Sequence, residues 1–565
     1  MLSELAGLWP ISVRPGREFR QSLGLLGVDR DAEQVLEAGY VLSTGAGLGV
    51  AGAATLIGGV LPAVLLGAAC GLGLVSAVPR LPRVLATFRR TRALGDAVEL
   101  VGLLALQLRL TPVPERAARF TARTGDGLLA RSLRDWVGRS VGTPRTGLQG
   151  FGREWEPWFP ALARAVSNLE AAAEADPDRR DRVLDRAVDT VDRALSERVQ
   201  AFANELHGPV TGLYAFGVLL PLALVGTLPA ATAAGIPITP AVFVLGYDVL
   251  LPGSVAVAGV KLLAARPVAF PPPTVSPSGA KRRRRIVLGV AAGFGGVGVG
   301  WVVGTTLVGG WAGHIAAVGA GSGAVLVVVS RPIVRERRRV RELERGLSDA
   351  LSVVGRAVSE GTAVENAVER AGAITSGPVS EAFEGAARRR ELLGVRLGRA
   401  FLGTHGPMAT RGGTRSRGAV ALLVAAAREG RPAGDALRTY ADRLDELLEH
   451  ERTGRRALAT VTRTLSHTAA LFGPLVGGAT VALARRLAEA DARLTAGQAG
   501  TMLPPDLVGT AVGWYVLLLA VILTSLATGL ERGLDGWLVA YRTGIALLTA
   551  VGSFLAGVVG AGLLL

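Results

Sequence analysis

The sequence predicts an all-α, polytopic membrane protein with about nine transmembrane helices and two cytoplasmic helical-bundle domains in a parallel tandem repeat. Hydrophobic residues make up 49% of the 565 residues and the mean hydropathy is +0.39, yet the chain also carries 62 Lys and Arg and 46 Asp and Glu. The apolar and charged residues are segregated along the chain, as expected where apolar helices cross a bilayer and polar segments stay in water. Two of the polar segments also share a sequence pattern.

Residues 1–40 are predicted to form an amphipathic cytoplasmic lead-in. They lack the continuous apolar core and the small-residue cleavage site of a signal peptide, so the first span is expected to act as its own insertion signal. Asp31 precedes AEQVLEAGY and is a candidate helix N-cap.

Nine apolar runs are close to the roughly 20 residues that a helix needs to cross a bilayer. They group into two hairpins, two pairs and one additional helix at the C-terminal end. The predicted membrane segments are hairpin 1 at 41–78, pair 2 at 208–264, hairpin 3 at 286–329, pair 4 at 465–528 and the additional helix at 543–565.

The positive charges predict the orientation of these spans. Three stretches, 79–207, 265–285 and 330–464, contain 52 of the 62 Lys and Arg. Because Lys and Arg are retained on the cytoplasmic side, all three stretches and the N-terminus are expected in the cytoplasm and the C-terminus outside, in a multi-pass protein of the cytoplasmic membrane. The net charge of +16 then reflects topology and contact with anionic lipids, and no nucleic-acid-binding motif accompanies it.

The first and third of these stretches are predicted to be the two helical domains. The stretch 265–285 between them is predicted to be a Pro-rich, basic cytoplasmic linker, and 330–464 is the second domain. In the first domain, 79–207, Asp176 and Pro177 are expected to begin a long helix with an apolar seam. The apolar residues of the seam recur at spacings of three and four, which is typical of helix bundles: Leu184, Val188, Val191, Leu195, Val199, Phe202 and Leu206.

The tandem repeat is predicted from short matches between the two halves. LGDAVELVG from Leu94 matches LSDALSVVG from Leu347, which contains Asp349. Four spans per unit is an even number, so both halves would insert in the same orientation. Gly361 and Gly430 each follow a glutamate and are expected to end a helix in the left-handed conformation, and Pro474 lies in a shared pattern at the start of the seventh span.

Motifs for catalysis and cofactor binding are missing or misplaced. The chain has two lysines, Lys261 and Lys281, and neither belongs to a P-loop. A GxGxxG motif from Gly293 lies inside an apolar run, where helix packing explains it better than a dinucleotide. The five histidines form no metal-binding pattern. We therefore expect no enzyme activity, no metal and no cofactor.

In its motifs the second half resembles the type II secretion system F-domain family, the platform proteins of type IV pili, type II secretion and archaella. The similar segments are LSDALSVVGRAVSEGTAVENAVERA, AAAREGRPAGDALRTYADRL and SHTAALFGPLVGG. Nine spans with two cytoplasmic domains is most similar to the archaeal members. The first copy departs from the pattern, because Leu110 stands where the second copy has Gly361.

The resemblance implies a platform protein of pilus assembly or protein secretion. Such a protein couples a separate hexameric secretion ATPase to the extraction and assembly of pilin or archaellin subunits. Whether it forms a homodimer is left open by the sequence. Two arginine groups are candidates for contact with the ATPase by charge complementarity, or alternatively with membrane lipids or solvent. They are Arg335, Arg337, Arg338, Arg339 and Arg341, and then Arg388, Arg389 and Arg390.

The competing function is a polytopic transporter or channel with cytoplasmic regulatory domains. Asp248, in FVLGYDVLLPG, is the one acid expected within a span, and intramembrane acids often serve ion or proton pathways. A helix–helix hydrogen bond or an interfacial position is the alternative explanation. The other spans are nearly free of charge and Asp248 has no match in the second half, which favours the platform.

Overall fold

The computed structural model is helical throughout the part of the chain that it describes, and that part contains no β-strand. The all-α prediction is therefore confirmed. The described residues are 9–10, 13–28, 31–58, 60–125, 127–143, 146–233, 239–267, 279–411, 413–429, 432–494, 503–533 and 535–564.

Seven helical segments in the described residues have the length and composition to cross a membrane. They correspond to the last seven of the nine predicted spans. The first two predicted spans fall in α3 (Ala32–Gly58) and α4 (Val60–Ala77), which are not among these seven segments, so the number nine is not confirmed. The elements of the seven segments are α12 (His207–Tyr214), η1 (Ala215–Leu219) and α13 (Leu220–Ala233); α14 (Pro240–Val244), η2 (Leu245–Leu250) and α15 (Leu251–Ala265); α16 (Gly279–Leu307); α17 (Gly310–Ser359); η3 (Thr468–Phe472) and α24 (Gly473–Leu494); α25 (Pro505–Arg532); and α26 (Gly536–Leu564).

Helix α25 forms the centre of the membrane bundle. In its most apolar stretch 67% of the residues are buried, against 17% in α16 at the periphery. It packs against α15, α17, α24 and α26 and against two of the three π-helical segments, η2 and η3. The spans are therefore arranged around α25 rather than as two separate halves.

Small residues bring α16 and α17 into close contact. A Cβ atom built on Gly296 or Gly300 would lie 2.7 or 2.3 Å from the carbonyl oxygens of Ala320 and Ala316, so only glycine fits there. The GxGxxG motif is thus part of a helix contact, as predicted, although only its first glycine, Gly293, lies at the interface.

The first helical domain consists of α5 (Leu81–Gly95), α6 (Ala97–Leu110), α7 (Pro114–Thr124), α8 (Leu128–Arg139), α9 (Gly147–Trp155), α10 (Pro160–Glu174) and α11 (Pro177–Glu205). The predicted long helix is α11, and it begins at Pro177. Its seam is confirmed, because every residue of the predicted seam is buried. Asp176, the residue before α11, makes no side-chain capping bond.

The second helical domain combines the polar part of α17 with six further helices. Its core includes Phe383 and Phe401, whose ring centroids are 5.2 Å apart in an edge-to-face arrangement. No break separates span six from this domain, because α17 continues for 50 residues with Pro332 inside it. The other helices are α18 (Val364–Ile374), α19 (Pro378–Leu393), α20 (Leu397–Leu402), α21 (Pro407–Arg411), α22 (Thr414–Glu429) and α23 (Pro432–His467).

Helix α6 joins the two domains. Its residues Leu104 and Leu108 belong to the core of the first domain, whereas Leu103 and Leu106 belong to the core of the second. Helix α11 also packs against α23. The two helical domains are therefore packed together as one body.

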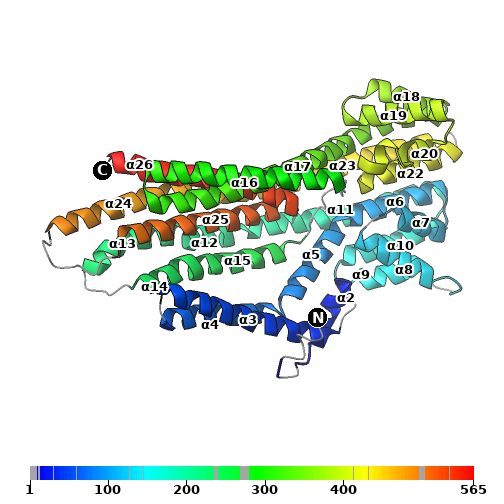
Figure 1. Cartoon of the computed structure of the whole chain (residues 1–565). Helices are drawn as coiled ribbons and strands as arrows, with labels where there is room; N and C mark the ends of the chain where they lie inside the picture. Colours follow the sequence, from blue (N-terminus) through cyan, green and yellow to red (C-terminus); the bar gives the residue numbers. More distant parts are fainter. Residues whose placement is uncertain are drawn as a thin grey trace.

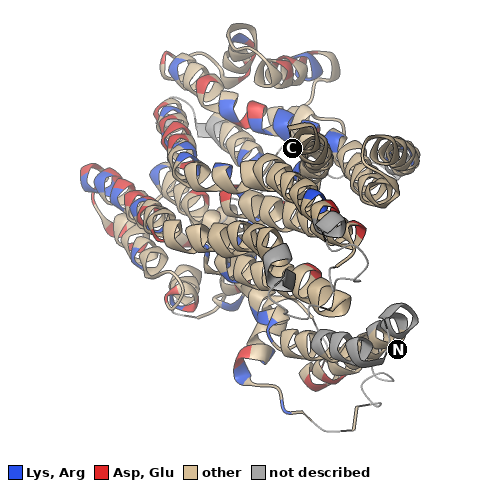
Figure 2. Cartoon of the chain, turned by 90° about the vertical axis from the view of Figure 1, so that its left-hand side faces the viewer, with Lys and Arg blue, Asp and Glu red and all other residues tan. Residues whose placement is uncertain are grey.

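Both domains lie at the same end of the membrane bundle (Figure 1). Helix α2 (Arg17–Leu25) lies on the domain side and buries Phe19 and Leu23 against α3, in agreement with an amphipathic lead-in. The end of α26 lies at the opposite end of the bundle (Figure 1). Viewed along the spans, the bundle is almost entirely free of Lys, Arg, Asp and Glu, which concentrate on the helices of the domains (Figure 2).

Candidate functional site

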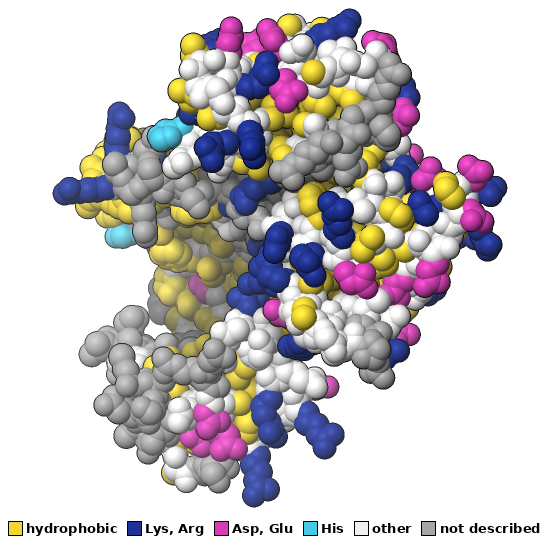
Figure 3. All heavy atoms as spheres, turned by 90° about the vertical axis from the view of Figure 1, so that its right-hand side faces the viewer, with side chains coloured by type: hydrophobic (Ala, Val, Ile, Leu, Met, Phe, Trp, Pro, Cys, Tyr) yellow, Lys and Arg dark blue, Asp and Glu magenta, His cyan; other side chains and the backbone are white. Residues whose placement is uncertain are grey.

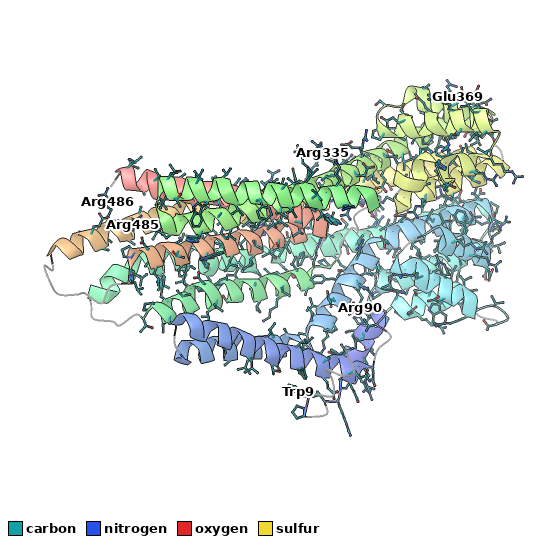
Figure 4. The ribbon with its side chains drawn as sticks, viewed as in Figure 1. Trp9, Arg90, Arg335, Glu369, Arg485 and Arg486 are labelled. Carbon is teal, nitrogen blue, oxygen red and sulfur yellow. The ribbon has the colours of Figure 1, made fainter. Side chains whose placement is uncertain are left out.

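The first predicted arginine group lies on α17 where the spans meet the second domain (Figure 4). Its side chains point in different directions because successive residues of a helix are about 100° apart. Arg335, Arg338 and Arg339 are exposed. Arg337 is turned inward and forms an ion pair with Asp535, which is buried, and Arg341 is half-buried. Only three of the five are therefore available to a partner protein.

The second arginine group, on α19, is divided in the same way. Arg388 is exposed, Arg389 donates a hydrogen bond to the carbonyl of His405, and Arg390 has a buried Nε without a partner among the described residues. Arg388 is the member of this group that faces solvent.

Gly361 adopts the predicted left-handed conformation, with φ at +97°. The N–H of Thr362 donates to the carbonyl of Ala357 and the N–H of Gly361 to that of Val358, at 2.9 and 3.0 Å. These two bonds define a Schellman motif at the end of α17. Asp349 is exposed on α17 and Pro474 is the second residue of α24, whereas Gly430 lies outside the described residues.

Asp248 lies within a span, in the π-helical segment η2. Its Oδ1 and the hydroxyl of the adjacent Tyr247 are buried without a hydrogen-bond partner among the described residues. Tyr247 contacts Tyr515 of α25, with ring centroids 4.7 Å apart, and the Tyr515 hydroxyl donates to the carbonyl of Gly217 in η1. Local π-helical geometry often marks functional positions, and here η1 and η2 meet at Tyr515.

The contact between the two helical domains contains a buried ionic cluster that was not predicted from the sequence. Arg415 of α22 pairs with Glu451 of α23, and its Nε lies 3.5 Å from Glu99 of α6. Desolvation alone would lower the pKa of Arg415, but the surrounding carboxylates raise it. The hydroxyl of Tyr440 is also buried, without a partner in the described part of the chain, and burial raises its pKa.

A second group of ion pairs joins α11 to α23. Arg443 binds Asp185 and Asp189 with N–O distances of 3.0 Å for both, and Arg109 of α6 also binds Asp185, at 2.6 Å. His450 lies 2.6 Å from the carboxylate of Asp192. A cavity of about 60 Å³ lies between the two groups and is lined mainly by apolar atoms. The arrangement can hold two domains together, but it offers no set of reacting groups.

No cluster of three metal-binding side chains occurs within the described residues. Comparison with known proteins gives no further identification: no family model matches the chain, and no curated protein or solved structure matches it significantly.

Proposed function

We propose that this chain is a platform protein of the cytoplasmic membrane that transmits the movement of a separate hexameric secretion ATPase to its spans, and so drives the extraction and assembly of pilin or archaellin subunits. The proposal places the N-terminus and both domains in the cytoplasm and the C-terminus outside. It rests on the resemblance of the second half to the F-domain family and on the mechanical continuity of the helices.

The observation that carries the proposal is the unbroken helix α17. One rod of 50 residues begins in the membrane bundle and ends in the core of the second domain, where Leu347, Leu351 and Val354 are buried. Helix α23 similarly runs for 36 residues and continues through η3 into α24. Since a helix is stiff along its axis, displacement of the second domain would move both spans directly.

The contact between the domains supports the same function. The ion pairs of Arg415 and Arg443 and the shared helix α6 connect the second domain to α11, which leads into the span formed by α12, η1 and α13. A force on one domain would therefore reach spans of both halves. The π-helical segment η1 follows α12, which comes directly after α11, and η3 follows α23; this similarity supports the proposed tandem repeat.

A flexible insertion tests this coupling. Four Gly and Ser residues inserted between Ser330 and Arg331 would interrupt the rod of α17, and the same insertion in the exposed loop between Ser376 and Gly377 serves as the control. We expect the first variant to keep membrane insertion and ATPase binding but to lose filament assembly, and the control to keep all three. Normal assembly by the first variant would contradict transmission through α17.

The transporter or channel is retained as a second candidate because of Asp248. A buried carboxylate oxygen without a partner among the described residues, next to Tyr247 and Tyr515, is the kind of group that binds an ion or a proton in a membrane. Asp248→Asn would abolish ion or solute flux in proteoliposomes if this function is correct. It would leave filament assembly unchanged if the platform function is correct.

A further inference from the structure

Four packed helices bring arginines together at the domain end of the membrane bundle. Arg266 directly follows α15, Arg532 is the last residue of α25, and Arg341 and Arg455 lie in the polar parts of α17 and α23. Helix α25 packs against α15, α17 and α23, so these arginines share one region although they are as far as 266 positions apart in the sequence. We call these four residues the junction arginines.

Arg266 is the most enclosed of the junction arginines. Only 5% of the residue is exposed, and its Nη1 donates a 2.7 Å hydrogen bond to the carbonyl of Gly529 in the last turn of α25. Its Nε is buried with no hydrogen-bond partner among the described residues. A buried charged donor without an acceptor is costly, so an acceptor from outside the chain would stabilise it.

The carboxylates nearby do not balance this positive charge. Glu531 is shared between Arg532 and Arg542, at 3.0 and 2.6 Å, and Asp535 pairs with Arg337. Arg455 pairs with Glu451, at 3.3 Å, but Glu451 is also the partner of Arg415. Arg341 makes no ion pair within the described residues; its Nε donates only to the carbonyl of Arg337, at 3.4 Å.

The junction arginines also act on one another electrostatically. The pKa of Arg266 is lowered to about 10, mainly by burial and also by the charge of Arg455. The pKa of Arg341, which lies beyond the apolar part of α17, is lowered to about 10 as well, mainly by burial and also by the charges of Arg532 and Arg455. Arg266 and Arg341 remain protonated at neutral pH, so the region carries uncompensated positive charge.

We propose that the junction arginines form a binding site for a phosphate ester anion at the domain end of the spans. A phosphate group presents several acceptor oxygens that match the planar guanidinium group, and it would supply the acceptor that Arg266 lacks. The site lies where α15 and α25 end, which is the level of lipid headgroups. The phosphate of an acidic phospholipid reaches this level without leaving the bilayer.

The domain end of the molecule is hollowed. Viewed from this end, Lys and Arg side chains border a hollow between the two lobes of the surface (Figure 3). The protein surface of a motor would not reach Arg266, because it is almost fully buried. A lipid headgroup is small enough to approach it.

Lipid binding to the full-length protein in detergent tests the site. Phosphatidylglycerol, phosphatidylcholine and inorganic phosphate are compared as probes, with bound lipid counted by native mass spectrometry and the unfolding temperature measured in parallel. We expect phosphatidylglycerol to bind and to raise the unfolding temperature, with phosphatidylcholine binding more weakly. Stabilisation by inorganic phosphate alone would assign the site to a soluble phosphate, and equal results for both lipids with no effect of phosphate would overturn the proposal.

Two variants link the binding to these residues. The double change Arg341→Gln and Arg455→Gln is expected to weaken phosphatidylglycerol binding about tenfold, since it removes two charge-assisted contacts. In the absence of lipid, the double variant should be at least as stable as the unchanged protein, because the substitutions relieve repulsion among the junction arginines. Arg338→Gln, an exposed change on the same helix, is the control and should bind as the unchanged protein does. If the double variant bound phosphatidylglycerol as tightly as the unchanged protein does, the proposed site would be contradicted.

Discussion

At the residue scale, the contact between the domains depends on charged side chains that are removed from water. Arg415 lies between Glu451 and Glu99, and burial keeps all three side chains largely out of solvent. Such a cluster stabilises only while every member has its partner, because one unpaired buried charge costs about 3–5 kcal/mol. The cluster therefore selects one relative placement of the domains.

Glu344 of α17 makes the stability of this contact depend on pH. Its pKa is raised from 4.5 to about 7, mainly by burial; Glu99 and Glu451 contribute to the increase, while Arg415 and Arg341 oppose it. The folded protein therefore holds this proton more tightly than the unfolded chain does. Its contribution to stability is complete below about pH 4.5 and is lost as the pH rises through about 7.

We therefore expect Glu344→Gln to stabilise the protein above pH 7 relative to the unchanged chain and to have little effect at pH 4.5. Denaturant titration of both proteins in detergent from pH 4.5 to pH 8 measures the difference in the free energy of unfolding. A difference that does not change with pH would show that Glu344 titrates normally.

At the element scale, the end of α17 depends on the backbone freedom of one glycine. The φ of Gly361 lies in the left-handed region, which costs other L-residues roughly 1–2 kcal/mol. We expect Gly361→Ala to lower the free energy of unfolding by about that amount. Gly385, in the middle of α19, has no atom within 4 Å of the Cβ position, so Gly385→Ala should raise stability by about 0.5–1 kcal/mol. If denaturant titration showed that both substitutions change the free energy of unfolding in the same direction, the role given to Gly361 would be contradicted.

Local patterns predicted the helices better than they predicted the contacts between them. The seam of α11 and the cap at Gly361 follow from short-range spacing, and both were correctly predicted. The partners of Arg415 lie 36 and 316 positions away in the sequence, so no local pattern indicates them. The arginine groups were predicted as units, but helical geometry turns Arg337 toward Asp535 and leaves Arg335 outside.

At the scale of the whole molecule, the two domains pack together as one body and are not independent modules that are each attached only to their own spans. Helix α6 buries residues on more than one face, because it contributes to both cores. The proposed motor, bound to one domain, would therefore act on both domains. Arg335 and Arg339, one turn apart on α17, are exposed and are the charges that we propose to meet it.

The last prediction concerns this contact. Arg335→Glu with Arg339→Glu should weaken binding of the secretion ATPase roughly tenfold at low salt, because two attractive contacts with an acidic motor surface become repulsive, and the difference should shrink at high salt. Arg485→Glu with Arg486→Glu makes the same charge change at the opposite end of the bundle (Figure 4) and should bind normally in the same pull-down. If both double variants bind the ATPase equally well at low salt, the exposed arginines of α17 serve the membrane surface instead of the motor.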